Sequence, residues 1–145
     1  MNQTDPTYPL PYLFLGDTYA EKEMYEEALD QWCKGDILLK IHTPESCERE
    51  NAAFREAIKK DGATGFWHKS LERSLKEYEQ GATLAMSVAG KYAKLGEKER
   101  AFEWLESAFA KRDPELSYLK INESFDNLKS DPRFTDLLRR IGLPQ

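Results

Sequence analysis

A spacing of residue types that occurs twice in the chain constrains its fold more than any other feature. The segment PYLFLGDTYAEKEMYEEALDQW, residues 11–32, sets Tyr and Leu residues around a glycine, with an Ala and a Trp further on. Residues 85–105 repeat this spacing. The positions that correspond at a distance of 73 residues are Leu15 and Val88, Tyr19 and Tyr92, Ala28 and Ala101, and Trp32 and Leu105. Such an internal period predicts a series of similar units.

The distance between the two copies predicts a third unit between them. A helix pair of about 34 residues fits twice into this distance and leaves about five residues over. A step of about 34 residues back from the last copy places Gly62 at the turn position of Gly96. The middle copy departs from the pattern at Trp67, which replaces a small residue. We assign the extra residues to a connector, Thr43 to Cys47, with Ser46 as a candidate N-cap.

The repeated residue types suit two antiparallel helices that pack closely. Small residues let the helix axes approach, and larger side chains fill the space around them. The small residues are Gly16, Ala28, Ala89 and Ala101, and the large ones are Tyr12, Leu15, Tyr19, Trp32, Tyr92 and Leu105. One pair cannot bury its own apolar faces, so neighbouring pairs must stack. We therefore predict an all-α superhelix, or solenoid, in a single domain, residues 1–145, with helix pairs at about 9–42, 48–81 and 82–115 and a C-terminal cap at 116–145.

The cap contains the signals of one more amphipathic helix. Ser130, Asp131 and Pro132 are typical of a helix start. The residues that then fall on one face are Phe134, Leu137, Leu138 and Ile141, with Arg139 and Arg140 near the negative end of the helix dipole and Gly142 and Pro144 as its stop. The segment before it is expected to pack beneath this helix as a short helix and an irregular stretch, through Tyr118, Leu119, Ile121 and Phe125.

With these residues the chain resembles the tetratricopeptide repeat (TPR) family. The first and last units match the family's pattern, with Tyr12 and Ala85 where Trp is usual and Pro114 one place beyond the usual proline. The stretches DGATGFWHKSLE and LGEKERAFEWLESAFAKRDP, with the tail, are similar to the C-terminal TPR region of bacterial multidomain regulators. In those proteins the repeats follow a winged-helix DNA-binding domain or a protein-kinase domain. The resemblance implies the sensing or scaffolding part of such a regulator, or a stand-alone relative.

Composition and motifs argue against several classes of function. A formal net charge of −5 disfavours direct binding of nucleic acid, and no apolar run approaches the roughly 20 residues that span a bilayer. His42 and Cys47 lack a second pair of metal ligands, and His68 has no nucleophile or carboxylate spaced to serve it. We predict that the chain is not an enzyme, that it holds no metal or cofactor, and that it is cytoplasmic. Cys33 and Cys47 are then reduced thiols, and a single bridge between them is the alternative.

The resemblance implies that the first helix of each pair lines a concave inner face. The corresponding candidate contact residues are Leu10, Leu13, Asp17 and Met24 in the first pair, Arg49, Glu56, Lys59 and Lys60 in the second, and Met86 and Lys94 in the third. Apolar residues among mixed charges suit a peptide or a partner helix, although each residue has surface or packing as its alternative role. Leu13 and Asp17 replace the Lys and Asn with which some relatives hold a C-terminal carboxylate, which argues against that ligand.

The sequence therefore predicts a protein–protein interaction scaffold or regulatory module whose partner is a protein or peptide. The first alternative is self-association into a homo-oligomer, with the stretch Pro9 to Phe14 packed against a second chain. The second alternative is a small-molecule sensor or an enzyme built in the groove. No membrane partner is expected.

Overall fold

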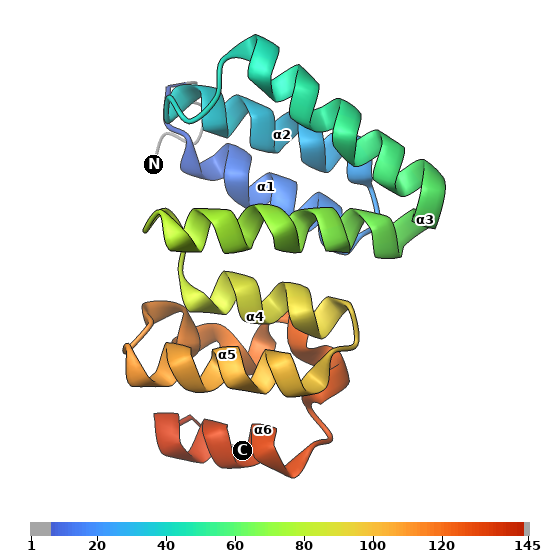
Figure 1. Ribbon diagram of the computed structural model, residues 1–145. Coiled ribbons are helices and arrows are strands. Elements are labelled where there is room, and N and C mark those ends of the chain that lie inside the picture. Colours follow the sequence, from blue (N-terminus) through green and yellow to red (C-terminus); the bar gives the residue numbers. More distant parts are fainter. Residues whose placement is uncertain (1–6, 144–145) are drawn as a thin grey trace. The chain divides into compact units, whose positions relative to one another are not determined.

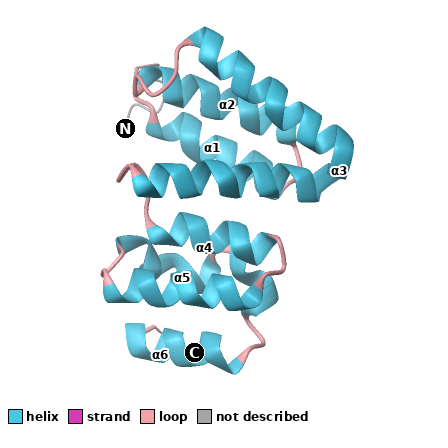
Figure 2. Ribbon diagram, viewed as in Figure 1, coloured by secondary structure: helices cyan, strands magenta, loops and turns pink. Residues whose placement is uncertain are grey.

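The computed structural model describes residues 7–143, and in that range every regular element is a helix (Figures 1 and 2). The elements are α1 (Leu10–Glu21), α2 (Tyr25–Leu38), α3 (Pro44–Glu79), α4 (Ala85–Lys94), α5 (Lys98–Ala110), the 3₁₀ helices η1 (Pro114–Ile121) and η2 (Glu123–Leu128), and α6 (Pro132–Ile141). The prediction of an all-α fold is confirmed. The chain divides into two compact units, Met1–Phe66 and Trp67–Gln145, with the boundary inside α3. That the repeats form a single domain stays a prediction.

The first and last helix pairs have boundaries that match the sequence period. α1 ends at Glu21 and α2 begins at Tyr25. Seventy-three residues later, α4 ends at Lys94 and α5 begins at Lys98. The 73-residue period of the sequence pattern is therefore also the separation between corresponding helix ends.

The two turns between these helices share one hydrogen-bond pattern. Each is closed by a bond from an N–H to the carbonyl five residues earlier, Met24 to Tyr19 at 2.9 Å and Glu97 to Tyr92 at 3.0 Å. The residue inside each turn has a left-handed backbone, Glu23 with φ 60° and Gly96 with φ 78°. This is the Schellman arrangement, which satisfies the last carbonyls of a helix and favours glycine at the left-handed position.

The predicted middle pair is a single element, α3, that is broken at one residue (the bend lies at the α3 label in Figure 1). Gly62 has φ 62° and ψ −138°, a conformation that is open to glycine and strained for other residues. Three residues later, a Cβ on Gly65 would overlap the carbonyl oxygen of Ala57. Residues eight apart on a straight helix lie about 12 Å from each other, so the chain reverses sharply at Gly62. The predicted turn residue is correct, and the non-helical backbone is confined to this one residue.

The expected connector Thr43 to Cys47 instead begins the helix. The N–H of Ser46 donates to Oγ1 of Thr43 at 3.1 Å, and the N–H of Thr43 donates to Oγ of Ser46 at 2.9 Å. Such reciprocal bonds close the first turn of a helix in the manner of a capping box. The N-cap is therefore Thr43 and not Ser46, and Pro44 occupies the first helical position, where its missing N–H costs nothing.

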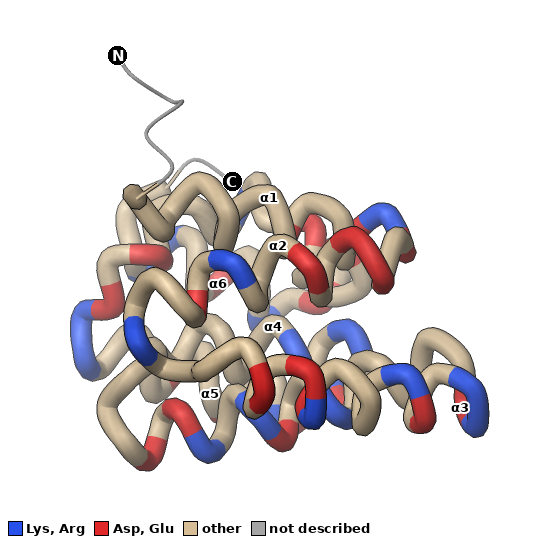
Figure 3. The backbone as a smooth tube through the Cα atoms, turned by 90° about the horizontal axis from the view of Figure 1, so that it is seen from above, with Lys and Arg blue, Asp and Glu red and all other residues tan. Residues whose placement is uncertain are grey.

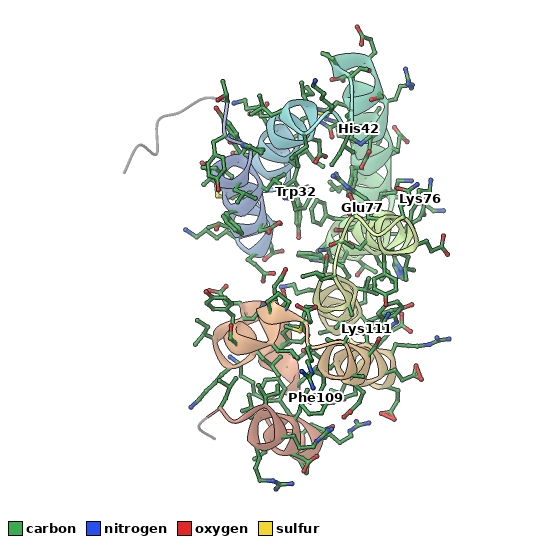
Figure 4. The ribbon with its side chains drawn as sticks, turned by 90° about the vertical axis from the view of Figure 1, so that its left-hand side faces the viewer. Trp32, His42, Lys76, Glu77, Phe109 and Lys111 are labelled. Atoms are coloured by element: carbon green, nitrogen blue, oxygen red, sulfur yellow. A yellow bond between two sulfur atoms is a disulfide. The ribbon has the colours of Figure 1, made fainter. Side chains whose placement is uncertain are left out.

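Close packing in the first helix pair follows the predicted small residues. Gly16 of α1 lies under the indole of Trp32 in α2, and a Cβ there would come within 2.6 Å of Nε1. That Nε1–H donates to Oδ1 of Asp17 at 2.9 Å, which fixes the ring over the glycine (Trp32 is labelled in Figure 4). Ala28 is fully buried. The prediction that Leu15 fills the same interface is wrong, because its side chain is 41% exposed.

The second unit has one contiguous apolar core, to which α4, α5, η1, η2 and α6 all contribute. Ala89, Ala101 and Leu105 are buried in it, as predicted. The 3₁₀ helices insert every third residue, because a 3₁₀ turn contains three residues. The buried residues are Leu116, Leu119, Phe125 and Leu128. Tyr118 and Ile121 are 61% and 72% exposed, so the expectation that these two pack beneath the last helix is wrong.

The predicted capping helix is present as α6. Asp131 is its N-cap and accepts a hydrogen bond from the N–H of Arg133, and Gly142 ends it with φ 94°. Pro144 lies outside the described residues. Phe134, Leu137 and Leu138 are buried against the rest of the core.

Ion pairs also attach α6 to α5. Each pair joins residues that lie 34 positions apart, Glu99 with Arg133 and Glu106 with Arg140. The hydrogen bond from Arg140 lowers the pKa of the Glu106 carboxyl. The paired residues of α5 and α6 are therefore separated in the sequence by 34 residues, which is the length of one unit of the predicted repeat.

Candidate functional site

The predicted contact residues of the first pair lie at the surface of α1 and of the turn that follows it. Leu10 is 39% and Met24 38% exposed. Leu13 is half-buried, because its side chain packs against Gly35 of α2. Asp17 is exposed and holds the Trp32 ring through the hydrogen bond described above. Leu10 and Met24 are therefore the apolar members of the predicted set that this unit keeps at its surface.

The candidates on the first half of α3 are all charged and all exposed. They are Arg49, Glu56, Lys59 and Lys60. The same helix half has an ion-pair cluster in which Arg55 bonds to Glu26 at 2.9 Å and to Glu48 at 3.2 Å. The guanidinium of Arg55 has a raised pKa because it donates to the Glu26 carboxylate. This cluster connects α2 to α3 on the outside of the unit.

The candidates on α4 have other roles in the second unit. Met86 is only 3% exposed and belongs to the core, so it is not available to a partner in this structure. The physical reason is η2, which packs along the same side of α4. Asn127 donates its amide N–H to the carbonyl oxygen of Ala93 at 2.8 Å, and Ser124 lies 3.4 Å from the position of a Cβ on Gly90. The tail thus covers the α4 surface that the sequence assigned to a partner.

Lys94 is half-buried, and its Nζ lies 5.0 Å from the centroid of the Trp67 ring. A cation over an indole face is a stabilising contact. Trp67 itself is buried, although it replaces the small residue of the repeat pattern. Lys94 therefore contributes to packing within its own unit.

The two cysteines form a disulfide, and the prediction of reduced thiols is wrong. Cys33 of α2 and Cys47 of α3 are bonded, with their Cα atoms 5.9 Å apart. The sequence left this bridge as the alternative, since two cysteines alone do not decide between the two states. The bond holds the first turn of α3 against α2.

The two histidines differ in their surroundings. His42, labelled in Figure 4, is half-buried, with Nε2 at 2.7 Å from a Glu50 carboxylate oxygen and Nδ1 at 3.0 Å from the Ser46 hydroxyl. These contacts brace the first turns of α3. His68 is exposed. Among the residues that the structure describes, no three His, Cys, Asp or Glu side chains gather as metal ligands would.

A Tyr–Lys pair in the second unit also has an altered pKa. Nζ of Lys111 donates to the Tyr78 hydroxyl and lies 4.7 Å from the centroid of its ring. This hydrogen bond lowers the pKa of Tyr78. Trp104 packs edge-on against the same ring at 4.8 Å between centroids. The pair fastens the end of α3 to α5, and its surroundings are those of a packing contact.

Among the large apolar residues of the first unit, the most exposed one lies outside the predicted contact set. Phe14 is 64% exposed and lies one turn after Leu10 on α1. Together with Leu15 these residues form what we call the α1 patch, Leu10, Phe14 and Leu15, on the side of α1 that α2 does not cover. The signal was present in the run LPYLFL, residues 10–15, since a surface helix normally carries apolar residues on one face and not all round.

A comparison with protein families, with curated proteins and with solved structures finds no match for this chain. In the part of the chain that the structure covers, no helix combines the length and the apolar character needed to cross a membrane.

Proposed function

We propose that the chain is a protein-interaction module of the tetratricopeptide type, which holds an apolar peptide or helix of a partner on its first helix pair. The observation that carries this proposal is the α1 patch. Exposed apolar side chains that gather on one element are a common mark of interaction sites. Phe14 is an anchor of the kind that dominates such interfaces, because a large aromatic ring gains much free energy when it is buried.

The matched helix ends and turns support the tetratricopeptide assignment. A repeat protein leaves the outer side of its first helix pair without a neighbour, so apolar residues there need another cover. In the last pair, the tail already covers the corresponding helix α4. The first pair is therefore the part of the repeat array in which a partner finds apolar surface.

Selection of peptides from a phage-displayed library tests this proposal. Peptides enriched on the wild-type protein are expected to lose binding to Phe14→Asp and to keep it on Tyr118→Asp, a matched control at an exposed aromatic residue of the other unit. A truncated anchor of this kind typically costs about 2 kcal/mol, or roughly thirtyfold in affinity. Enriched peptides that bind Phe14→Asp and the wild type equally well would remove the α1 patch as the site.

Self-association is a second candidate, since two residues of the patch, Leu10 and Phe14, lie in the stretch Pro9 to Phe14 that the sequence assigns to this role. Sedimentation velocity over a concentration series separates the two proposals. A dimer that Phe14→Asp dissociates would assign the patch to a second copy of the chain. A monomer at all concentrations would leave the patch to a different partner.

A further inference from the structure

The charge of the protein is concentrated beside the α1 patch. Residues 10–38, which form α1, α2 and their turn, contain seven acidic and two basic residues. Their net charge of −5 equals that of the whole chain, so that the remaining acidic and basic residues balance (acidic residues are red in Figure 3). Solvent screens charges over roughly 8 Å at physiological ionic strength, which makes this a local field of the first helix pair.

The acidic residues extend the apolar stripe of α1. Positions three and four apart on a helix are surface neighbours, which places Asp17 one turn after Phe14 and Glu21 one turn further. The first two turns of this stripe are therefore apolar and the last two acidic. Glu23 in the following turn is exposed as well. The hydrogen bond from Trp32 holds the Asp17 carboxylate in place next to the patch.

We propose that the α1 patch binds a cationic amphipathic segment of a partner protein, an inference that rests on the function proposed above and names the chemistry of its partner. Apolar side chains of that segment pack on Leu10 and Phe14, and its Lys or Arg residues lie over the acidic end of the stripe. Complementary charge of this kind raises the association rate and selects the partner. A second copy of the chain fits poorly, because two acidic helix pairs would face each other.

Two designed peptides with the same apolar face test the charge preference. Fluorescein-labelled LKKLLKLLKKLLKL and LEELLELLEELLEL are titrated with the full chain and followed by fluorescence anisotropy. The Lys peptide is expected to bind at least about tenfold more tightly than the Glu peptide, and its affinity is expected to fall as NaCl rises from about 50 to about 300 mM. Equal affinities for the two peptides would overturn the proposal.

Substitution of Phe14 by Asp separates docking on the patch from mere attraction of charges. The added negative charge would strengthen binding that is only electrostatic, whereas loss of the apolar anchor is expected to weaken binding of the Lys peptide roughly tenfold or more. Tyr118→Asp adds the same charge to the other unit and is expected to change the affinity less than about twofold. Unchanged or tighter binding by Phe14→Asp would refute docking at α1. Phe14→Ser serves if the helical circular-dichroism spectrum of Phe14→Asp differs from wild type.

Charge reversal tests the acidic half of the site. Glu23→Lys is expected to weaken binding of the Lys peptide roughly threefold. Glu103→Lys, which changes the net charge by the same amount on the exposed side of α5, is the control expected to have little effect. Equal losses from both would show that net charge alone is sensed and would overturn the proposal. If the Glu peptide binds the wild type and Phe14→Asp abolishes that binding, the proposal of a cationic partner is refuted, while the proposed interaction module still stands. If neither peptide binds, the proposal of a cationic partner is refuted. The proposed interaction module is tested separately, by the selection of phage-displayed peptides.

Discussion

Asp113 offers the sharpest test of how the second unit is held together. Its carboxylate is buried, with 6% exposure, and accepts two backbone hydrogen bonds. Oδ1 accepts from the N–H of Glu115 at 2.8 Å, in the first turn of η1, and Oδ2 accepts from the N–H of Met86 at 3.1 Å, in the first turn of α4. One side chain thus caps the starts of two helices, one of which lies far away in the sequence.

Replacement of Asp113 by Ala leaves both N–H groups without this acceptor. A hydrogen bond to a charged group contributes about 1.5–3 kcal/mol, and an unsatisfied buried donor costs a similar amount. We therefore expect Asp113→Ala to lower the free energy of unfolding by about 3 kcal/mol, which corresponds to a fall in Tm of roughly 15 °C for a unit of this size. Asp113→Asn keeps one oxygen acceptor, and we expect about half the loss.

Urea denaturation followed by far-UV circular dichroism measures both variants. Asp126→Ala is the matched control, because Asp126 is exposed and pairs only with the exposed Lys129 at 2.7 Å among the contacts described. We expect the control to change the free energy of unfolding by less than about 0.5 kcal/mol. An Asp113→Ala variant within about 1 kcal/mol of the wild type would refute the double-capping role.

Single substitutions test the backbone at Glu23, the disulfide and the N-cap of α6. Glu23→Gly relieves a left-handed backbone and is expected to stabilise the protein by about 0.5–1 kcal/mol. Glu103→Gly, inside α5, is the control and is expected to lower the free energy of unfolding by about 1 kcal/mol. If urea denaturation shows that both substitutions stabilise the protein, or that both destabilise it, the backbone argument is contradicted. Cys33→Ser opens a disulfide between residues 14 positions apart and is expected to cost about 3 kcal/mol against the oxidised wild type. Two thiols that react with Ellman's reagent in the unreduced, denatured wild type would disprove the bridge. The Arg133 side chain lowers the pKa of Asp131 to about 2, below its unfolded value of about 3.9, so its stabilising effect is present above about pH 4 and is lost toward pH 2. Asp131→Asn is expected to reduce the loss of the free energy of unfolding between about pH 4 and pH 2. If that loss is the same as in the wild type, the assigned role of Asp131 is contradicted.

Local features of the fold could be predicted because they depend on nearby residues. Each Schellman turn spans only six residues and begins at Tyr19 or Tyr92. Because the sequence period relates these two tyrosines, it also predicts that the two turns have the same geometry. Gly62 was identified from the period alone, since the period places it where a turn must begin. The cap residues of α6 were equally local, with Asp131 before it and Gly142 after it.

Contacts between distant segments could not be predicted in the same way. The burial of Met86 depends on η2, and nothing in the spacing of α4 shows that a tail packs along it. Ile121 was misplaced because the tail has a period of three residues and not the 3.6 of an α-helix. The disulfide required Cys33 and Cys47 to meet in space. The α1 patch was only partly foreseen, because Phe14 falls outside the family pattern from which the contact residues were taken.

A map of amide chemical shifts tests the central claim, that the first helix pair is the docking site. The ¹⁵N-labelled protein is titrated with LKKLLKLLKKLLKL, and the shift changes are followed along the chain. We predict changes concentrated at residues 10–24, with the strongest near Phe14 and Asp17, and little effect on η1 and α6. Changes that spread evenly over the chain, or that centre on the second unit, would contradict the claim.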